Sequence, residues 1–205
     1  MTAFDAIVLA GGRAARLGGT PKPGLLLGGT RLLDLALAAV AEATAVAVVG
    51  PADLADAVGR AVLTREDPPF GGPVAGIDAG LRALARPGSP GVVVLLAVDV
   101  PGAGRAVPRL LAAVTDDVDG ACLERGGHAQ WLVAAVRRDR LVAAVETLRA
   151  QAGSVHDQPV RRLVAALRLA AVPDTDGASD DVDTWDDLAR MNQARRDAAA
   201  RKGMP

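Results

Sequence analysis

Residues 7–22 read IVLAGGRAARLGGTPK. The apolar opening predicts a strand over residues 4–10, because the run is continuous and glycines stop it. The glycines that follow let backbone N–H groups approach phosphate oxygens closely. Three cations, Arg13, Arg16 and Lys22, add positive charge around a negative ligand. The alternative is a plain glycine turn with exposed basic residues. The coincidence of spacing, glycines and cations favours a cradle for a nucleoside triphosphate, although the Gly-Lys-Ser/Thr ending of the P-loop is missing.

The composition bounds the class of protein. A chain of 205 residues, 50% of them apolar, is long enough for one domain with a full core. A net charge of −1 excludes the basic footprint of a general nucleic-acid binder. Cys122 is the single cysteine, which excludes an internal disulfide and a zinc site built on thiolates. No signal peptide or membrane helix is evident, so we expect a cytoplasmic protein that binds neither nucleic acid nor membranes.

Short apolar runs alternate with helical patterns over the first half of the chain. The clearest strand spans residues 91–98, where VVVLLAV carries no polar break, as expected when both faces of a sheet are covered. This alternation predicts an α/β fold in three layers, with a mainly parallel central sheet and helices on both faces. Further strands are expected at residues 45–49 and 61–64, and helices at 32–43, 53–58 and 74–85.

The second half of the chain is less regular and ends in a helix. Thr184 and Asp187 form an approximate capping box for a last helix over residues 184–200. We predict a single domain over residues 1–200, with a nucleotide-binding half (1–104), an acceptor-substrate half (105–200) and a frayed tail (201–205). The other expected elements are helices at 107–114 and 138–150, strands at 120–123 and 130–136 around a turn at 126–127, a mobile loop at 153–159, and a helix end with a last strand within 163–172.

Asp99 follows the strand at residues 91–98 directly. Ligands of an open parallel sheet bind at the carboxyl ends of its strands, which is also where the glycine turn lies. A carboxylate at this place can hold Mg²⁺ against triphosphate oxygens. The alternative is an Asp that opens a turn before Pro101. Placement at the same end of the sheet as the glycine turn favours the metal role.

A rigid loop, DPPFGGPVAG at residues 67–76, precedes the helix expected at 74–85. Its backbone can press against a purine or a ribose, while Asp67 can accept hydrogen bonds from N–H or hydroxyl groups of a ligand. An ordinary proline-rich connection is the alternative, and the length and rigidity of the loop argue against it.

A second acidic stretch, DDVDT at residues 180–184, precedes the last helix. Asp183 can be a second Mg²⁺ ligand beside Asp99. It can equally be one of the acidic residues that commonly cap a helix. The pattern alone leaves both interpretations open.

Several other polar residues are given structural interpretations. His128 and His156 lack a partner at metal-ligand spacing and are expected to face solvent, and Cys122 is expected in the core. Arg138, with Arg137 and Arg140 beside it, is interpreted as the solvated start of a helix. Arg161 and Arg162 either lie on an exposed helix face or bind a second phosphate-bearing molecule.

Four motifs stand in one order along the chain: LAGG at 9–12 followed by RLG at 16–18 and Lys22, then Asp67 with GPVAG at 72–76, then VDVP at 98–101, then Asp183-Thr184. Together they resemble the molybdenum cofactor guanylyltransferases, called MobA. The resemblance covers nearly the whole chain. It implies the Rossmann-like α/β fold of the nucleotidyltransferase superfamily.

The resemblance also implies an activity and a site. MobA enzymes transfer GMP from GTP to the molybdopterin (molybdenum) cofactor, release pyrophosphate and form the guanine dinucleotide cofactor. GTP and the molybdopterin cofactor would be the substrates, with molybdoenzymes or cofactor-insertion proteins as further partners. Asp99 would bind Mg²⁺, with Asp183 as a second ligand, and Arg16 would stabilise charge on the leaving phosphates. The residues implied to contact the nucleotide are Leu9, Ala10, Gly11, Gly12, Lys22, Asp67, Gly72 and Pro73.

Three positions depart from the pattern of the family. Ala14 stands where a small polar residue is common, Gly50 where an asparagine often helps to bind guanosine, and Asp183 where an asparagine is frequent. Gly50 weakens the assignment to guanine. Two alternatives therefore stay open: a related transferase that uses CTP or makes a sugar nucleotide, and a nucleotide-binding module without transfer activity. The intact Arg16, Lys22 and Asp99 argue against the second alternative.

Overall fold

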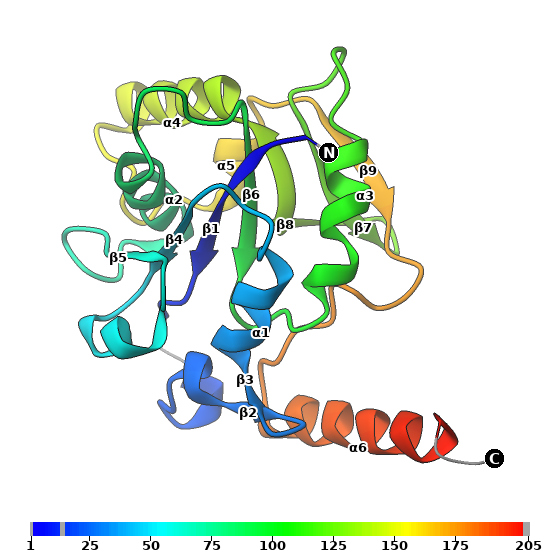
Figure 1. The fold of residues 1–205 in the computed structure, drawn as a ribbon. Coiled ribbons are helices and arrows are strands. Elements are labelled where there is room, and N and C mark those ends of the chain that lie inside the picture. The colour runs from blue at the N-terminus through cyan, green and yellow to red at the C-terminus, as the bar shows by residue number, and fades with distance from the viewer. Residues whose placement is uncertain (1, 13–14, 203–205) are drawn as a thin grey trace.

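The computed structural model describes residues 2–12 and 15–202. They form three layers, with a seven-stranded sheet between two layers of helices (Figure 1). The strand order is β5-β4-β1-β6-β8-β7-β9. The α/β fold expected from the sequence is confirmed. The strands are β1 (Phe4–Leu9), β4 (Val46–Val49), β5 (Val62–Thr64), β6 (Val92–Ala97), β7 (Gly120–Arg125), β8 (His128–Arg137) and β9 (Leu169–Pro173).

The sheet is mainly parallel, with β8 as its reversed strand. β1 pairs in parallel with β4 and β6, β4 with β5, and β7 with β9, whereas β8 runs antiparallel to β6 and β7. The chain runs from β1 to β4 and β5 and then returns to β6 on the other side of β1. Ligands bind at such a switch point, outside the carboxyl ends of the strands. Because Leu9 pairs with Ala97, the carboxyl ends of β1 and β6 lie side by side.

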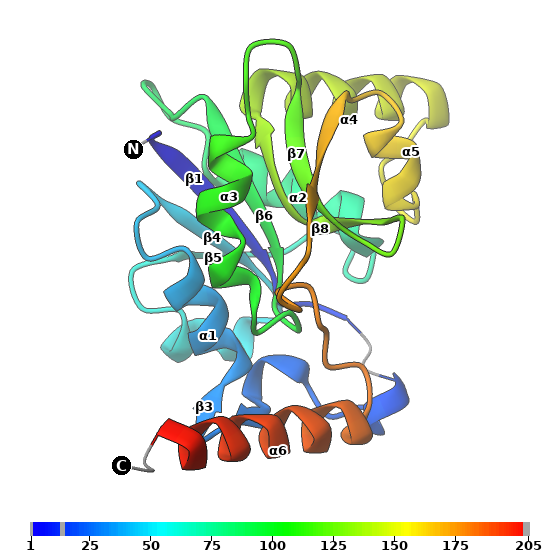
Figure 2. The same cartoon turned by 90° about the vertical axis from the view of Figure 1, so that its right-hand side faces the viewer.

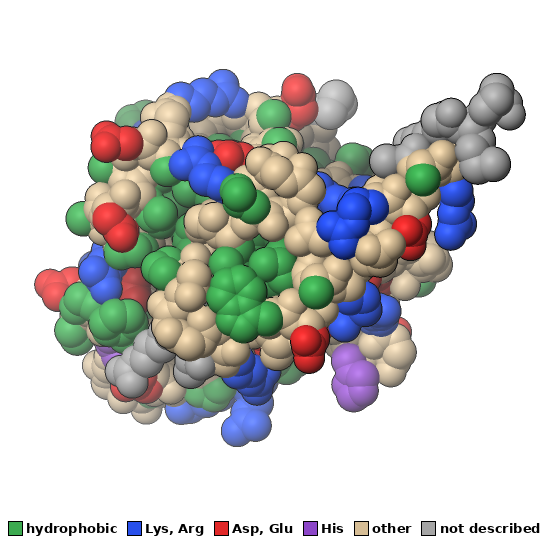
Figure 3. Space-filling model, turned by 90° about the horizontal axis from the view of Figure 1, so that it is seen from below, with side chains coloured by type: hydrophobic (Ala, Val, Ile, Leu, Met, Phe, Trp, Pro, Cys, Tyr) green, Lys and Arg blue, Asp and Glu red, His purple; other side chains and the backbone are tan. Residues whose placement is uncertain are grey.

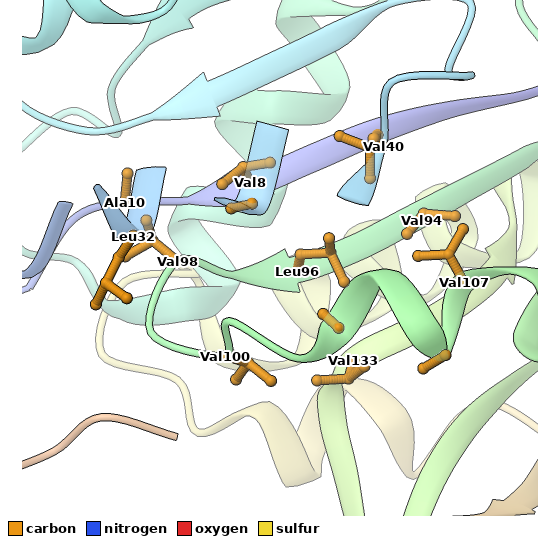
Figure 4. Close-up of a cluster of buried hydrophobic side chains, with 14 of the residues drawn as sticks. Val8, Ala10, Leu32, Val40, Val94, Leu96, Val98, Val100, Val107 and Val133 are labelled. Carbon is orange, nitrogen blue, oxygen red and sulfur yellow. The ribbon is translucent and has the colours of Figure 1, made fainter. Parts of the chain in front are cut away.

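Helices cover both faces of this sheet (Figure 2). Successive side chains of a strand point to opposite faces of the sheet, and helices bury both faces. This explains why the strands are continuous apolar runs. Val8 and Leu96 belong to the core under α1 and α3, which Figure 4 shows in close-up, whereas Ile7 and Leu95 pack in the core under α2, α4 and α5. The helices are α1 (Leu32–Ala39), α2 (Gly72–Ala83), α3 (Val107–Ala112), α4 (Arg138–Ala152) and α5 (Val160–Val164).

Two glycines of α2 allow this helix to lie directly against β1. A Cβ atom at Gly80 would come 2.7 Å from Cγ2 of Ile7, and one at Gly76 would come 3.0 Å from Cδ2 of Leu9. The two glycines are four residues apart and therefore share one face of the helix. Because Leu9 ends β1, this close contact fixes the start of α2 beside the carboxyl end of β1.

A small hairpin and the last helix form a separate layer below the main sheet in Figures 1 and 2. The hairpin, which the sequence analysis did not predict, consists of β2 (Leu26–Leu27) and β3 (Thr30–Arg31). The last helix, α6 (Trp185–Lys202), packs on it. The N–H of Gly28 donates to Oδ1 of Asn192 at 2.8 Å, and Arg195 donates to the carbonyl of Leu27 at 3.2 Å.

The interpretation of Arg138 as part of a solvated helix start is wrong. Its guanidinium binds the carboxylate of Asp5, which is fully buried in β1. Arg86 donates to both oxygens of Asp5 at 2.8 Å, and the N–H of Ala45 donates to Oδ1 at 3.1 Å. A buried carboxylate requires such partners. An acidic residue inside an apolar strand was the signal in the sequence for a buried cation.

The other elements begin and end within a few residues of the positions expected from the sequence. Two of them differ in helix type or in length. The short helix expected at 53–58 is a 3-10 helix at Ala52–Ala57. Residues 201–202, predicted as part of a frayed tail, continue α6, while residues 203–205 lie outside the described part of the chain. No helix in the described part of the chain has both the length and the apolar character needed to cross a membrane.

Candidate active site

A cavity of about 650 Å³ opens at the carboxyl ends of β1, β4 and β6 and at the start of α2. Figure 3 views the molecule from this end, where hydrophobic side chains gather near the middle and charged side chains surround them. The volume lies within the range of small-molecule sites. Eight of the residues expected to form the site line it: Leu9, Ala10, Gly11, Gly12, Lys22, Gly72, Pro73 and Asp99.

The glycine turn presents its backbone to this cavity. The N–H of Ala10 still donates to the carbonyl of Val49 at 2.8 Å, which extends the pairing of β1 with β4. Gly11 and Gly12 follow, exposed, and no described residue accepts their N–H groups. Gly12 has a φ of +137°, a value that residues with a side chain rarely adopt. Arg13 and Ala14, which the sequence analysis also considered, lie outside the described residues.

Lys22 joins the two carboxylates that were predicted as metal ligands. Its Nζ atom donates to Oδ2 of Asp99 at 2.6 Å and to Oδ1 of Asp183 at 2.5 Å. The side chains of Lys22 and Asp99 are 19% and 21% exposed. Burial lowers the pKa of Lys22, but hydrogen bonds to Asp183 and Asp99 and the attraction of both charges outweigh it, so the pKa is raised above its ordinary value. The ammonium is therefore fully charged at neutral pH.

Arg16 forms the outer edge of this cluster. Its guanidinium donates to Oδ2 of Asp183 at 2.8 Å, so Asp183 binds two cations at once. The side chain of Arg16 is 74% exposed and does not line the cavity. An exposed pair of this kind contributes little to stability. Arg16 is therefore a solvent-facing cation at the mouth of the site, next to Lys22.

Backbone and cap hydrogen bonds bring Asp183 to Lys22. The N–H of Val182 donates to the carbonyl of Asp99 at 2.8 Å, which ties the acidic segment to the end of β6. The capping box is confirmed in the next residues: Asp187 N–H donates to Oγ1 of Thr184 at 3.1 Å, and Thr184 N–H donates to Oδ2 of Asp187 at 2.9 Å. The hydrogen bond from the Thr184 hydroxyl is the main cause that lowers the pKa of Asp187 to about 2. Because Thr184 and Asp187 cap α6, the side chain of Asp183 binds cations instead.

The donor set suits a divalent cation bound with a triphosphate. Asp99 and Asp183 bind Lys22, and Asp183 also binds Arg16. Asp181 adds a third negative charge near this cluster. Desolvation, together with the charges of Asp183 and Asp99, raises the pKa of Asp181. No group of three His, Cys, Asp or Glu residues with metal-binding geometry occurs among the described residues. Mg²⁺ in proteins commonly binds one or two carboxylates, and water and phosphate oxygens complete its coordination. Asp99 and Asp183, the two carboxylates that bind the Lys22 ammonium, fit that pattern.

Comparison with known proteins decides the family. The profile of the MobA-like NTP transferase domain matches residues 6–173. This chain belongs to the MobA-like NTP transferase family. A molybdenum cofactor guanylyltransferase from Bradyrhizobium sp. (strain ORS 278) is 38% identical over 135 residues, which are 62% of this chain and 63% of that protein. The alignment thus spans under two thirds of the length of the relative.

Solved structures share the fold over almost the full chain. A Mycobacterium sp. strain JC1 homologue of the Mycobacterium tuberculosis protein rv0371c is 26% identical, with a TM-score of 0.69, over 95% of this chain and 98% of that chain. Molybdopterin-guanine dinucleotide biosynthesis protein A from Archaeoglobus fulgidus has a TM-score of 0.71 at 19% identity, over 94% and 99% of the two chains. At that lower identity the likeness concerns the fold alone. The Rossmann-like fold implied by the resemblance is confirmed.

In this MobA-like NTP transferase, Asp67 stands apart from the cavity at the switch point. It lines a neighbouring cavity of about 350 Å³ with Asp78, Arg82 and Arg149. His156, expected to face solvent, is half-buried there, with Nε2 2.9 Å from the carbonyl oxygen of Asp67. The role of Asp67 in nucleotide binding stays a prediction.

Part of the cavity wall was not predicted from the sequence. The 3-10 helix after β4 supplies Asp53 and Leu54 to it, and the segment after β5 supplies Arg65 and Glu66. These residues follow strands that were themselves predicted. Their position at the carboxyl ends of β4 and β5 was therefore the signal that could have found them. Arg161 and Arg162 line neither of the two cavities described and are exposed on α5.

Proposed function

We propose that this MobA-like NTP transferase transfers GMP from GTP to the molybdopterin cofactor and releases pyrophosphate. The observation that carries the proposal is the cluster in which Lys22 binds Asp99 and Asp183 beside the open backbone of Gly11 and Gly12. Cations, carboxylates and bare N–H groups are the parts that a triphosphate with a divalent cation requires. The curated relatives are named molybdenum cofactor guanylyltransferases, which supports the choice of nucleotide and acceptor.

The nucleotide fits this cavity in one direction. Its phosphates belong at the glycine turn with Lys22, because that end concentrates the cations and the backbone donors. Its base then extends toward the ends of β4 and β5, beneath the loop that leads into α2 at Gly72 and Pro73. We propose Asp99 and Asp183 as the residues that hold Mg²⁺. When bound, Mg²⁺ would neutralise phosphate charge as it does in other phosphoryl-transfer sites.

The reaction needs positioning and charge neutralisation more than a base. An oxygen of the acceptor's terminal phosphate forms a bond to the α-phosphorus of GTP, and the bond from that phosphorus to the bridging oxygen of pyrophosphate breaks. The attacking oxygen is already anionic at neutral pH, so no residue has to remove a proton. Lys22 and Arg16 would meet the charge that develops on the leaving pyrophosphate.

The acceptor is expected to approach from the second half of the chain. Asp183 comes from that half and borders the cavity through its contact with Lys22. We propose this side for the molybdopterin cofactor and for any molybdoenzyme or insertion protein that receives the product. A cytoplasmic location agrees with this proposal and stays a prediction.

The test is pyrophosphate release by the purified full chain with Mg²⁺, the molybdopterin cofactor and each of GTP, CTP, ATP and UTP. We expect turnover with GTP, and a loss of about 100- to 1,000-fold in Asp99→Asn. Asp34→Asn, which changes a half-buried carboxylate of α1 outside the cavity, is the matched control and should retain activity. Tight GTP binding without pyrophosphate release would overturn the transferase activity. Faster turnover with CTP would overturn the choice of GMP.

A further inference from the structure

Glu66 is the half-buried carboxylate at the end of the cavity away from Lys22. It follows β5 by two residues and lies between the two cavities, lining both of them. Its Oε1 atom accepts the N–H of Phe70 at 2.9 Å, which fixes the side chain against the loop that leads into α2. No described residue donates a hydrogen bond to its Oε2 atom. One carboxylate oxygen is thus anchored to the protein while the other keeps its full capacity to accept hydrogen bonds.

The other polar groups at this end are engaged or poorly placed. The guanidinium carbon of Arg65 lies 5.1 Å from the centroid of the Phe70 ring, so this cation stacks on an aromatic face. Asp53 is exposed on the 3-10 helix after β4. Gly50 has no side chain to offer, and a Cβ atom there would come 2.8 Å from Cδ1 of Leu54, so Leu54 already fills that space. Glu66 is left as the anchored polar side chain that can contact a base.

Guanine is the base that matches an anchored carboxylate. Its N1–H and its 2-amino group are neighbouring donors, and a carboxylate can accept both in a charge-assisted pair. Cytosine and adenine place a lone pair beside their amino group, and uracil places carbonyl oxygens on both sides of its N–H. Each of these would direct an acceptor at a negative oxygen, which is repulsive. The pocket therefore discriminates by unfavourable contacts as well as favourable ones.

We propose that Glu66 selects guanine by accepting hydrogen bonds from its N1–H and its 2-amino group. This inference rests on the proposed function, because it assigns the base of the nucleotide that the same cavity would bind. It also assigns the base contact to Glu66 and not to Asp67, because Glu66 lines both cavities whereas Asp67 lines the neighbouring one alone.

The test compares GTP with ITP, which lacks the 2-amino group, in the wild type and in Glu66→Gln. The introduced amide keeps an oxygen as the acceptor for the N–H of Phe70, while its NH₂ group points donors at the donors of guanine. We expect the wild type to prefer GTP over ITP by about 10-fold or more in kcat/KM. In Glu66→Gln the preference should fall to roughly 1- to 3-fold, through KM and not kcat, since this contact is equal in the ground and transition states.

Two control variants keep the result specific. Glu42→Gln makes the same chemical change at an exposed turn outside the cavity and should leave the GTP preference unchanged. Asp53→Asn neutralises the other carboxylate at this end of the cavity, which is the alternative contact for the base. An unchanged preference in Glu66→Gln, or its loss in Asp53→Asn alone, would overturn the role of Glu66. If the wild type releases no pyrophosphate with any nucleotide, the proposed function fails. Calorimetric binding of GTP and ITP to the same variants still decides the role of Glu66.

Discussion

Lys22→Met replaces the ammonium between two carboxylates with an uncharged side chain of similar length. Nζ lies 2.6 Å from Oδ2 of Asp99 and 2.5 Å from Oδ1 of Asp183, so these oxygens can be no farther apart than the sum, about 5 Å. Two negative charges at this separation repel by about 3 kcal/mol at an effective dielectric constant of 20, and by less than about 1 kcal/mol in bulk water. The substitution therefore turns an attractive cluster into a repulsive one.

The expected loss of stability lies between these limits. The side chains of Asp99 and Asp183 are 21% and 36% exposed, so solvent screens part of the repulsion. We expect Lys22→Met to lower the free energy of unfolding by about 1–2 kcal/mol, which corresponds to a Tm lower by about 2–8 °C for a chain of this length. Mg²⁺ should restore most of this loss, because a divalent cation can take the place of the missing charge between the carboxylates.

The assay is thermal unfolding in EDTA and in millimolar Mg²⁺, together with pyrophosphate release. The variant should gain more stability from Mg²⁺ than the wild type, in which Lys22 competes for the same carboxylates. Its turnover should fall by about 100- to 1,000-fold. Arg31→Met removes a cation from its pair with Asp34, whose side chains are 43% and 36% exposed, and should change neither property by much. A Lys22→Met protein as stable in EDTA as Arg31→Met, and indifferent to Mg²⁺, would refute the reasoning.

Three other predictions concern the frame of the site. Asp5→Asn leaves Arg138 without its buried anion and should lower the free energy of unfolding by about 3 kcal/mol in urea titrations. Gly80→Val pushes a side chain into β1 and should cost about 1–3 kcal/mol in the same assay; full stability would show that α2 can move away. Because the pKa of Asp187 is lowered to about 2, its contribution to stability is complete above about pH 4 and is lost as the pH falls toward 2. The carboxyl carbon shift of Asp187 in NMR should titrate near this lowered value, and a midpoint near 4 would contradict the cap.

The core strands were predictable because burial on both faces leaves a plain pattern. The apolar run at residues 91–98 and β6 (Val92–Ala97) agree within two residues, since no polar side chain can occupy either face. The β2–β3 hairpin was not predicted, because strands of two residues carry no periodicity. Gly28 and Gly29, both at positive φ, were the remaining signal for a tight turn.

Candidate site residues were predictable where they directly follow one strand. They were less predictable where their role depends on contacts between distant segments of the chain. Asp99 was found from its place after a buried strand. Asp183 was recognised as a candidate, yet the pattern could not separate a metal ligand from a helix cap. That choice depends on Val182 binding the backbone of Asp99 and on Asp187 supplying the cap, which are contacts between distant parts of the chain. Arg138 was misinterpreted for the same reason, since its partner lies in the first strand.

The Lys22 cluster also joins the two halves of the chain. Asp99 lies in the half of the chain that was predicted to bind the nucleotide, whereas Asp183 lies beyond residues 6–173, which match the family profile. The acidic segment reaches Lys22 because its backbone pairs with that of Asp99, which follows β6, and the capped α6 packs on the β2–β3 hairpin. A transferase that joins two substrates needs groups from both binding regions at the point of reaction. Lys22 binds one carboxylate from each half of the chain, which is the arrangement that the proposed transfer would require.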